Sequence, residues 1–113
     1  MVSRPAVKTG ELWLVDLDLT VGSEIQKTRP CVVVSPPEMH NYLRTVIVAP
    51  MTTGEQPAAF RIGSTFQGKR GLVLLDQIRT LDKIRPPKRM GTIAPVALKA
   101  VLTTLQSVFE PAS

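Results

Sequence analysis

The sequence is poor in the residues from which metal centres and disulfides are built. It has one histidine and one cysteine, and neither HExxH nor CxxC spacing occurs, so the usual zinc sites have no ligand set. Cys31 cannot form an internal disulfide, and its place in an apolar run predicts burial in the core. His40 lies in a connecting segment and is interpreted as a surface or turn residue. We therefore expect no metal and no other cofactor.

Long apolar runs and nucleotide-binding loops are also absent. No stretch approaches the roughly 20 apolar residues that a membrane helix needs, and the first residues lack the apolar core of a signal peptide, so we expect a cytoplasmic protein. No Walker loop, GxGxxG or GxSxG sequence occurs. The chain has 113 residues, of which 43% are hydrophobic and 20% charged, which fits a single folded domain over residues 1–113.

Negative charge is scarce relative to positive charge. Fourteen Lys and Arg residues face nine Asp and Glu residues, which gives a net charge of +5. Seven of the fourteen cations lie within residues 69–89, where only Asp76 and Asp82 oppose them. Such a cluster is either a solvated surface or a contact for a polyanion.

Short β-type segments separated by turn signals dominate the chain. This pattern, with one helix at the end, predicts a small antiparallel barrel with a helix packed on its side. Pro30 is placed at the first position of the second strand and Pro50 after the end of the third, because proline cannot donate a ladder hydrogen bond. A turn is expected over residues 63–71 and, at most, one helical turn over residues 38–43. The predicted strands cover residues 11–18, 31–34, 45–49, 59–62 and 72–80, with a further short strand over 83–85.

The last element is the only convincing helix. Pro95 fits the first helical position, and apolar residues follow at helical spacing, which predicts one face docked on the sheet. Trp13 is also assigned to the core. The apolar helix residues are Leu98, Val101, Leu102, Leu105 and Phe109, of which Phe109 is assigned to the core.

Two polar loops are the best candidates for chemistry. The first covers residues 20–30 and contains Glu24 and Arg29, which are five positions apart. The second covers residues 51–57 and contains Thr52. A metal-free set of arginine, threonine and glutamate best fits RNA cleavage, because the 2′-hydroxyl of the substrate is the nucleophile. The planar fork of Arg29 would bond two phosphate oxygens and stabilise the extra negative charge.

The same residues have plainer interpretations. Thr52 follows a strand, where threonine hydroxyls commonly satisfy local turns. Glu24 is the nearest candidate general base, but a glutamate in a polar loop is usually just solvated, and it would act as a base near neutral pH only if it were partly buried.

The order of these motifs closely resembles the MazF/PemK family of toxin endoribonucleases. The resemblance lies in Gly10-Glu11-Leu12-Trp13-Leu14-Val15-Asp16-Leu17-Asp18, Gly22-Ser23-Glu24, Thr28-Arg29-Pro30, Val48-Ala49-Pro50-Met51-Thr52-Thr53, Leu75-Asp76-Gln77-Ile78-Arg79-Thr80 and the closing helix. It covers nearly the whole chain in one order, which makes it more specific than any single motif.

This resemblance implies an SH3-like barrel with a C-terminal helix, shared with CcdB-type toxins, that assembles as a symmetric homodimer. Family members cleave single-stranded RNA at short sequences without a metal and leave a 2′,3′-cyclic phosphate and a 5′-hydroxyl. A cognate antitoxin holds them inactive by occupying the RNA groove. By motif position, Arg29 corresponds to the catalytic arginine and Thr52 to the catalytic threonine.

Two positions depart from the PemK branch of the family. PemK-like members have a histidine where this chain has Ser23, and an arginine where it has Leu74. The active loop is therefore MazF-like, and Asp76 is not assigned as the general base. Asp76 and Gln77 are instead assigned to RNA contact or to holding the geometry of the site.

RNA recognition is expected to depend on hydrogen bonds more than on stacking, because the chain has only five aromatic residues. Phosphate contacts are expected from the basic stretch that contains Lys83 and Arg85. The expected RNA-binding residues are Ser23, Gln26, Lys27, Thr28, Thr53, Gln56, Asp76, Gln77, Arg79, Lys83 and Arg85.

Two functions compete with RNA cleavage. One is a catalytically silent protein that only binds nucleic acid or an antitoxin, and the other is a CcdB-like inhibitor of DNA gyrase. The presence of both Arg29 and Thr52 favours cleavage.

Overall fold

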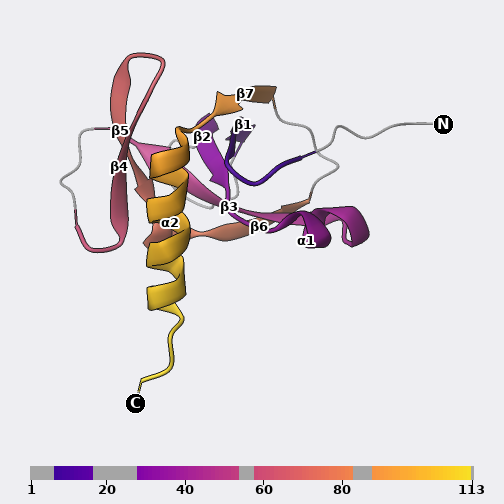
Figure 1. The fold of residues 1–113 in the computed structure, drawn as a ribbon. Coiled ribbons are helices and arrows are strands. Elements are labelled where there is room, and N and C mark those ends of the chain that lie inside the picture. Colours follow the sequence, from indigo (N-terminus) through magenta and orange to yellow (C-terminus); the bar gives the residue numbers. More distant parts are fainter. Residues whose placement is uncertain (1–6, 17–27, 54–57, 83–87, 113) are drawn as a thin grey trace, which may run out of the picture.

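The computed structural model describes residues 7–16, 28–53, 58–82 and 88–112, which form an antiparallel sheet with helices (Figure 1). The longest helix, α2 (Pro95–Val108), runs across one face of the sheet. The other elements are β1 (Glu11–Asp16), β2 (Thr28–Val33), α1 (Pro37–Tyr42), β3 (Thr45–Thr52), β4 (Arg61–Phe66), β5 (Lys69–Leu74), the 3₁₀ turn η1 (Leu75–Gln77), β6 (Arg79–Asp82) and β7 (Lys88–Thr92).

The strands follow the order β4-β5-β3-β2-β1-β7, and β6 also pairs with β3. Along β3 the partner changes: Val48 faces Arg79 of β6, whereas Met51 faces Val73 of β5. Because the 3₁₀ turn η1 separates β5 from β6, these two consecutive strands pair with β3 in two separate ladders. The sheet curls into a half-barrel with a C-terminal helix, so the expected antiparallel β fold with one docked helix is confirmed.

One hydrophobic cluster fills the space between the sheet and α2. We call it the first core cluster. Strand residues from β1, β2, β3 and β5 meet α2 through Ala97 and Val101, and Val101 is fully buried. Its buried members are Leu12, Val32, Ala49, Met51, Val73, Leu75, Ile93, Ala97 and Val101.

A smaller cluster, the second core cluster, lies on the other side of the sheet. Successive side chains of a strand alternate between faces, so β1, β2 and β3 each supply residues to both clusters. Trp13 is buried here, as expected. The members are Trp13, Val15, Cys31, Val33, Val46 and Val48, with Val7 and Leu81 packed against them.

Several expected boundaries are wrong. The second strand begins at Thr28, so Pro30 is its third residue, and β3 continues through Pro50 to Thr52. Met51 and Thr52 therefore belong to a strand and not to a polar loop. Residues 63–66 and 69–71 extend β4 and β5, and only Gln67 and Gly68 make the turn.

The long strand expected over residues 72–80 is also wrong, because η1 divides it. Strand β7 was not expected. The helical turn before β3 is confirmed as α1, and the helix from Pro95 is confirmed as α2. Phe109 is 69% exposed, so its assignment to the core is wrong. The expected strand over residues 83–85 lies outside the described residues.

Burial makes Cys31 a chemically quiet thiol. It is fully buried, and burial raises its pKa from the ordinary 9.0 to about 12, although the charges of Arg79 and Arg29 act in the opposite direction. Because the thiolate is the reactive form, we expect Cys31 to resist alkylation in the folded protein at pH 8 and to react once urea unfolds it. Equal labelling of the folded and unfolded protein would contradict this burial.

The raised pKa of Cys31 determines how the free energy of unfolding changes at high pH. Above pH 9 the thiol of the unfolded chain loses its proton while the folded chain keeps it until about pH 12, so the free energy of unfolding falls as pH rises through this window. Urea unfolding from pH 8 to pH 10.5 measures the fall. The Cys31→Ala variant is expected to show a shallower pH dependence.

Candidate functional site

Arg29 lies at the exposed start of β2, on the same strand as the buried Cys31. The Cys31 thiol donates a long hydrogen bond to the Arg29 carbonyl oxygen, with a distance of 3.6 Å between the sulfur and the oxygen. The backbone of Arg29 is held by its pairing with Val15 of β1, while its side chain remains exposed. Arg29 thus lies within β2, as its second residue, and not in the polar loop that the sequence predicts over residues 20–30.

Thr52 lies at the end of β3 and is half-buried. Its Oγ1 donates to the carbonyl oxygen of Thr53 across 3.4 Å, which is long for a hydroxyl hydrogen bond. The local turn interpretation of Thr52 therefore has some support, but the hydroxyl is only weakly engaged.

Arg29 and Thr52 lie at the same end of the β2–β3 ladder. Cys31 pairs with Pro50; Arg29 is two residues before Cys31, and Thr52 is two residues after Pro50. Because side chains alternate along a strand, both Arg29 and Thr52 project to the side of the second core cluster. The fold thus places a guanidinium and a hydroxyl on one face and at one end of neighbouring strands.

Arg79 adds a second cation to this face. It pairs with Val48 of β3, and it lies two residues before Leu81, which packs against the second core cluster. The charges of Arg79 and Arg29 both lower the pKa of the Cys31 thiol, against the larger effect of burial. Both guanidinium groups therefore act on the same point of the sheet, which creates a positive field suited to a phosphate.

Asp76 is held by an arginine from the neighbouring strand. In the β4–β5 ladder Arg61 lies opposite Leu74, and it donates from Nε to Oδ1 of Asp76 across 3.2 Å and from Nη2 to Oδ2 across 3.0 Å. The hydrogen bond from Arg61 is the main cause that lowers the pKa of Asp76, with smaller contributions from its own backbone amide and from Gln77. Both carboxylate oxygens are engaged, which suits a role in holding geometry better than a role as a base.

The Arg61–Asp76 pair leaves no signal in the sequence. The two residues are 15 positions apart, and only the register of β4 against β5 brings them together. Some of the other predicted site residues lie within the described part of the chain and some do not. Thr28 and Thr53 are exposed beside Arg29 and Thr52, and Gln77 is exposed in η1. Ser23, Glu24, Gln26, Lys27, Gln56, Lys83 and Arg85 lie outside the described residues.

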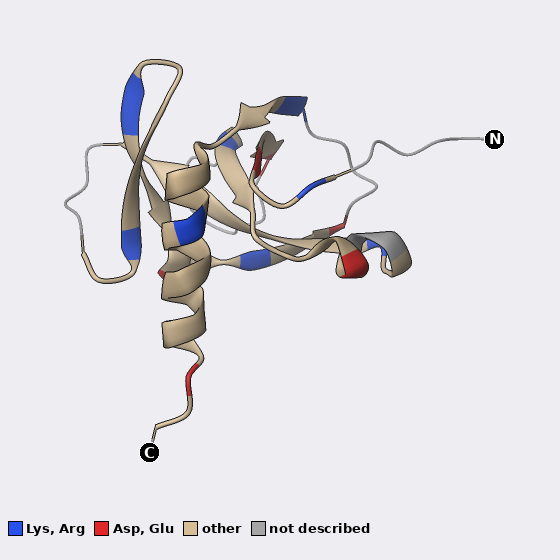
Figure 2. Cartoon of the chain, viewed as in Figure 1, with Lys and Arg blue, Asp and Glu red and all other residues tan. Residues whose placement is uncertain are grey.

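Positive charge is spread over several elements of the sheet. Figure 2 shows Lys and Arg on β7, β6 and the β4–β5 hairpin, and two of these arginines, Arg61 and Arg89, are paired with acidic residues. Within the described ranges, no three His, Cys, Asp or Glu side chains gather as metal ligands. In the same part of the chain no helix is both long and apolar enough to cross a membrane.

The curled sheet and the docked helix define the class of small half-barrel folds with a C-terminal helix. A mycobacterial endoribonuclease, solved in complex with its cognate antitoxin, has the same fold: the TM-score is 0.79 at 20% identity, over 96% of this chain and all of the other. At that identity the likeness concerns the fold alone.

Sequence comparison gives the family. The chain belongs to the PemK-like, MazF-like toxins of type II toxin-antitoxin systems, whose family model matches residues 8–109. It is 36% identical over 108 residues to the endoribonuclease PemK of Escherichia coli, covering 90% of this chain and 81% of PemK. It is 34% identical over 102 residues to the endoribonuclease toxin MazF of Escherichia coli K12, covering 89% of this chain and 92% of MazF.

Proposed function

We propose that this chain is the toxin of a type II toxin-antitoxin system and cleaves single-stranded RNA at short specific sequences without a metal. Membership in the family supports the toxin role, and the relatives in Escherichia coli are named endoribonucleases. The observation that carries the proposal is the placement of Arg29 and Thr52 at one end of the β2–β3 ladder, on one face of the sheet.

The reaction requires little covalent chemistry from the protein. The 2′-hydroxyl of the RNA attacks the adjacent phosphorus as it loses its proton, and the bond from phosphorus to the 5′-oxygen breaks as that oxygen gains one. The products are a 2′,3′-cyclic phosphate and a 5′-hydroxyl. In this proposal Arg29 bonds two oxygens of the phosphate as negative charge grows on them, and the hydroxyl of Thr52 contacts the same phosphate.

The other assignments follow from these two residues. Arg79 adds a positive charge on the same face, and Asp76, fixed by Arg61, holds the segment that carries Gln77. Glu24 remains the proposed general base. We further propose that the protein acts in the cytoplasm, as a homodimer, and is inhibited by a cognate antitoxin. The mycobacterial structure, which contains its antitoxin, supports the last point.

The test is incubation of the purified protein with a long single-stranded RNA in EDTA, followed by mapping of the fragment ends. We expect cuts at one recurrent short sequence, with cyclic phosphate at the 3′ ends and hydroxyl at the 5′ ends. If RNA of many sequences stays intact while the protein is folded, cleavage is ruled out. A gyrase-inhibition assay then separates the CcdB-like function from a binding-only regulator.

A further inference from the structure

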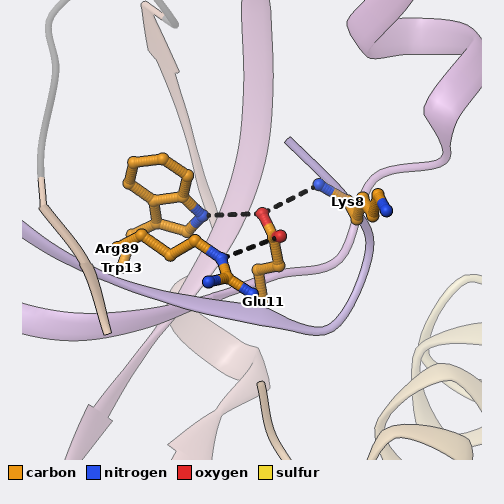
Figure 3. Close-up of polar contacts among 4 residues, drawn as sticks. All are labelled: Lys8, Glu11, Trp13 and Arg89. Carbon is orange, nitrogen blue, oxygen red and sulfur yellow. Dashed lines mark hydrogen bonds and ion pairs between the residues drawn. The ribbon is translucent and has the colours of Figure 1, made fainter. Parts of the chain in front are cut away.

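The buried carboxylate of Glu11 connects Lys8, which precedes β1, with β1 and β7. The side chain of Glu11 is only 7% exposed, and Figure 3 shows its carboxylate among three nitrogen donors. Oε1 accepts from the Lys8 backbone amide and from Trp13 Nε1, each across 3.0 Å, and Oε2 accepts from Arg89 Nε across 3.0 Å. A carboxylate with this many donors is rigid, and it fixes the groups that donate to it.

A β-bulge brings Arg89 to this carboxylate. In the β1–β7 ladder Leu12 faces Gly91 and Trp13 faces Arg89, so Met90 is an extra residue in β7. Without the bulge, Arg89 would face Leu14 and project to the opposite side of the sheet, because a shift of one residue reverses every side chain. Bulges commonly redirect a side chain in this way.

Gly91 is required beside the bulge. Its φ is +153°, and a Cβ at this position would lie 3.0 Å from Cε1 of Phe66. A larger residue here would strain the backbone of β7, and the ring of Phe66 would have to shift by a few tenths of an ångström. Gly91 is thus suited to the backbone conformation next to the bulge, and the bulge determines the face on which Arg89 lies.

The redirected arginine lies on the face of Arg29. One row across the sheet runs from Arg89 to Trp13, Cys31 and Pro50, and Arg29 is two residues along β2 from that row. Two strand spacings and two residue rises separate the Cα atoms of Arg89 and Arg29 by about 12 Å. The side chain of Arg89 is 51% exposed, and it contacts Glu11 through Nε.

We infer that Arg89 is an RNA phosphate contact and that Glu11 is the positioning residue that orients it. Glu11 binds the Nε edge of the guanidinium, which leaves the two terminal amino groups as a fork for phosphate oxygens. Buried among its donors, Glu11 holds this fork in place before RNA arrives, so that less conformational entropy is lost on binding. The inference rests on the proposed RNA cleavage and extends the substrate-binding face from β2 and β3 to β7.

The first test is the salt dependence of RNA binding. The probe is a 2′-O-methyl RNA of the mapped cleavage sequence, which the protein cannot cut because the nucleophile is blocked. We expect Arg89→Gln to weaken binding about tenfold and to lower the slope of log K against log salt by about 0.7, the value for one lost phosphate contact on a single strand. Single-turnover cleavage at saturating RNA is expected to change much less than the affinity.

Lys88→Gln is the matched control. It removes the same charge one residue away, but Lys88 faces Leu14 and projects to the other side of the sheet. We expect it to leave the salt slope close to that of the wild type. Equal slopes for Lys88→Gln and Arg89→Gln would show that only net charge matters and would overturn the assignment of Arg89.

Glu11→Gln tests the positioning role through its sign. Removing a negative charge from a site for a polyanion strengthens binding if charge alone acts, whereas loss of the anchor for Arg89 weakens it. We expect Glu11→Gln to weaken RNA binding in the wild-type protein and to leave it unchanged or stronger in the Arg89→Gln background. Tighter binding by the single variant would overturn the role of Glu11.

Two controls separate the possible failures. Thermal unfolding shows whether each variant is folded at the assay temperature. If either single variant is unstable, the Glu11→Gln/Arg89→Gln double variant replaces it, because that variant leaves neither member of the ion pair charged without its partner. Wild-type protein that neither binds nor cuts RNA would refute the proposed function itself. Wild-type cleavage with an unchanged salt slope for folded Arg89→Gln would refute only this inference.

Discussion

Replacing Arg29 with alanine is expected to slow RNA cleavage by about 10²- to 10³-fold, the usual cost of removing one donor that stabilises transition-state charge. Arg29→Lys is expected to recover only part of this loss, because a point charge replaces a planar fork that bonds two oxygens. The measurement is single-turnover cleavage of the mapped RNA at saturating protein, which separates chemistry from binding.

Arg44→Ala is the matched control for this change. Arg44 is an exposed arginine just before β3, and its loss is expected to leave the cleavage rate near that of the wild type. Near-normal turnover by Arg29→Lys would leave charge, and not the fork, as the contribution of Arg29. Near-normal turnover by Arg29→Ala would remove Arg29 from the proposed mechanism.

Leu12→Ala is expected to lower the free energy of unfolding by about 2–5 kcal/mol. Leu12 is fully buried in the first core cluster, between the sheet and α2, so the change removes apolar contacts and leaves a cavity. The total free energy of unfolding of a domain of this size is about 5–15 kcal/mol, so this loss is a large part of it. Because a loss of about 1 kcal/mol lowers the melting temperature of a small domain by about 4 °C or more, we expect a fall of about 8 °C or more. Urea and thermal unfolding measure both values.

Val96→Ala is the comparison for the core variant. Val96 lies in the first turn of α2 and is 77% exposed, and surface changes of this kind usually stay within about 0.5 kcal/mol. Similar destabilisation by Leu12→Ala and Val96→Ala would contradict the position of the core between the sheet and α2.

Pro50 shows where prediction of strands from sequence fails. A proline predicts the end of a strand because it cannot donate to a ladder. In the structure, however, β3 exchanges β6 for β5 between Val48 and Met51, and Pro50 falls in the interval, where that edge has no ladder bond to lose. This exchange of partners depends on η1, which lies well beyond β3 in the sequence.

Strand β7 was missed for a different reason. Its residues are largely polar or small, so they lack the alternation that identifies a half-buried strand. The turn between β4 and β5 uses Gln67 and Gly68, both at positive φ, as a tight hairpin requires. Glutamine at the first of these positions is not a turn signal, and the turn was therefore predicted to be much longer than it is.

In the candidate site, too, some features could be predicted from the sequence and others could not. Arg29 and Thr52 were selected from short motifs, but both were predicted to lie in polar loops. Their placement on one face depends on the register of β2 against β3, which the sequence does not reveal. The ion pairs of Asp76 with Arg61 and of Glu11 with Arg89 could not be predicted, because each depends on the register of two strands, and the second depends also on a bulge.

The pairing of β1 with β7 affects how the protein is made. Glu11 and Arg89 are 78 positions apart, so the edge of β1 that pairs with β7 stays uncovered until β7 has been synthesised. Contacts so distant in sequence are slow to form, and α2 follows later still. A nascent chain therefore cannot complete this face until β7 has been translated, which delays the assembly of the proposed RNA-binding face relative to the synthesis of β1.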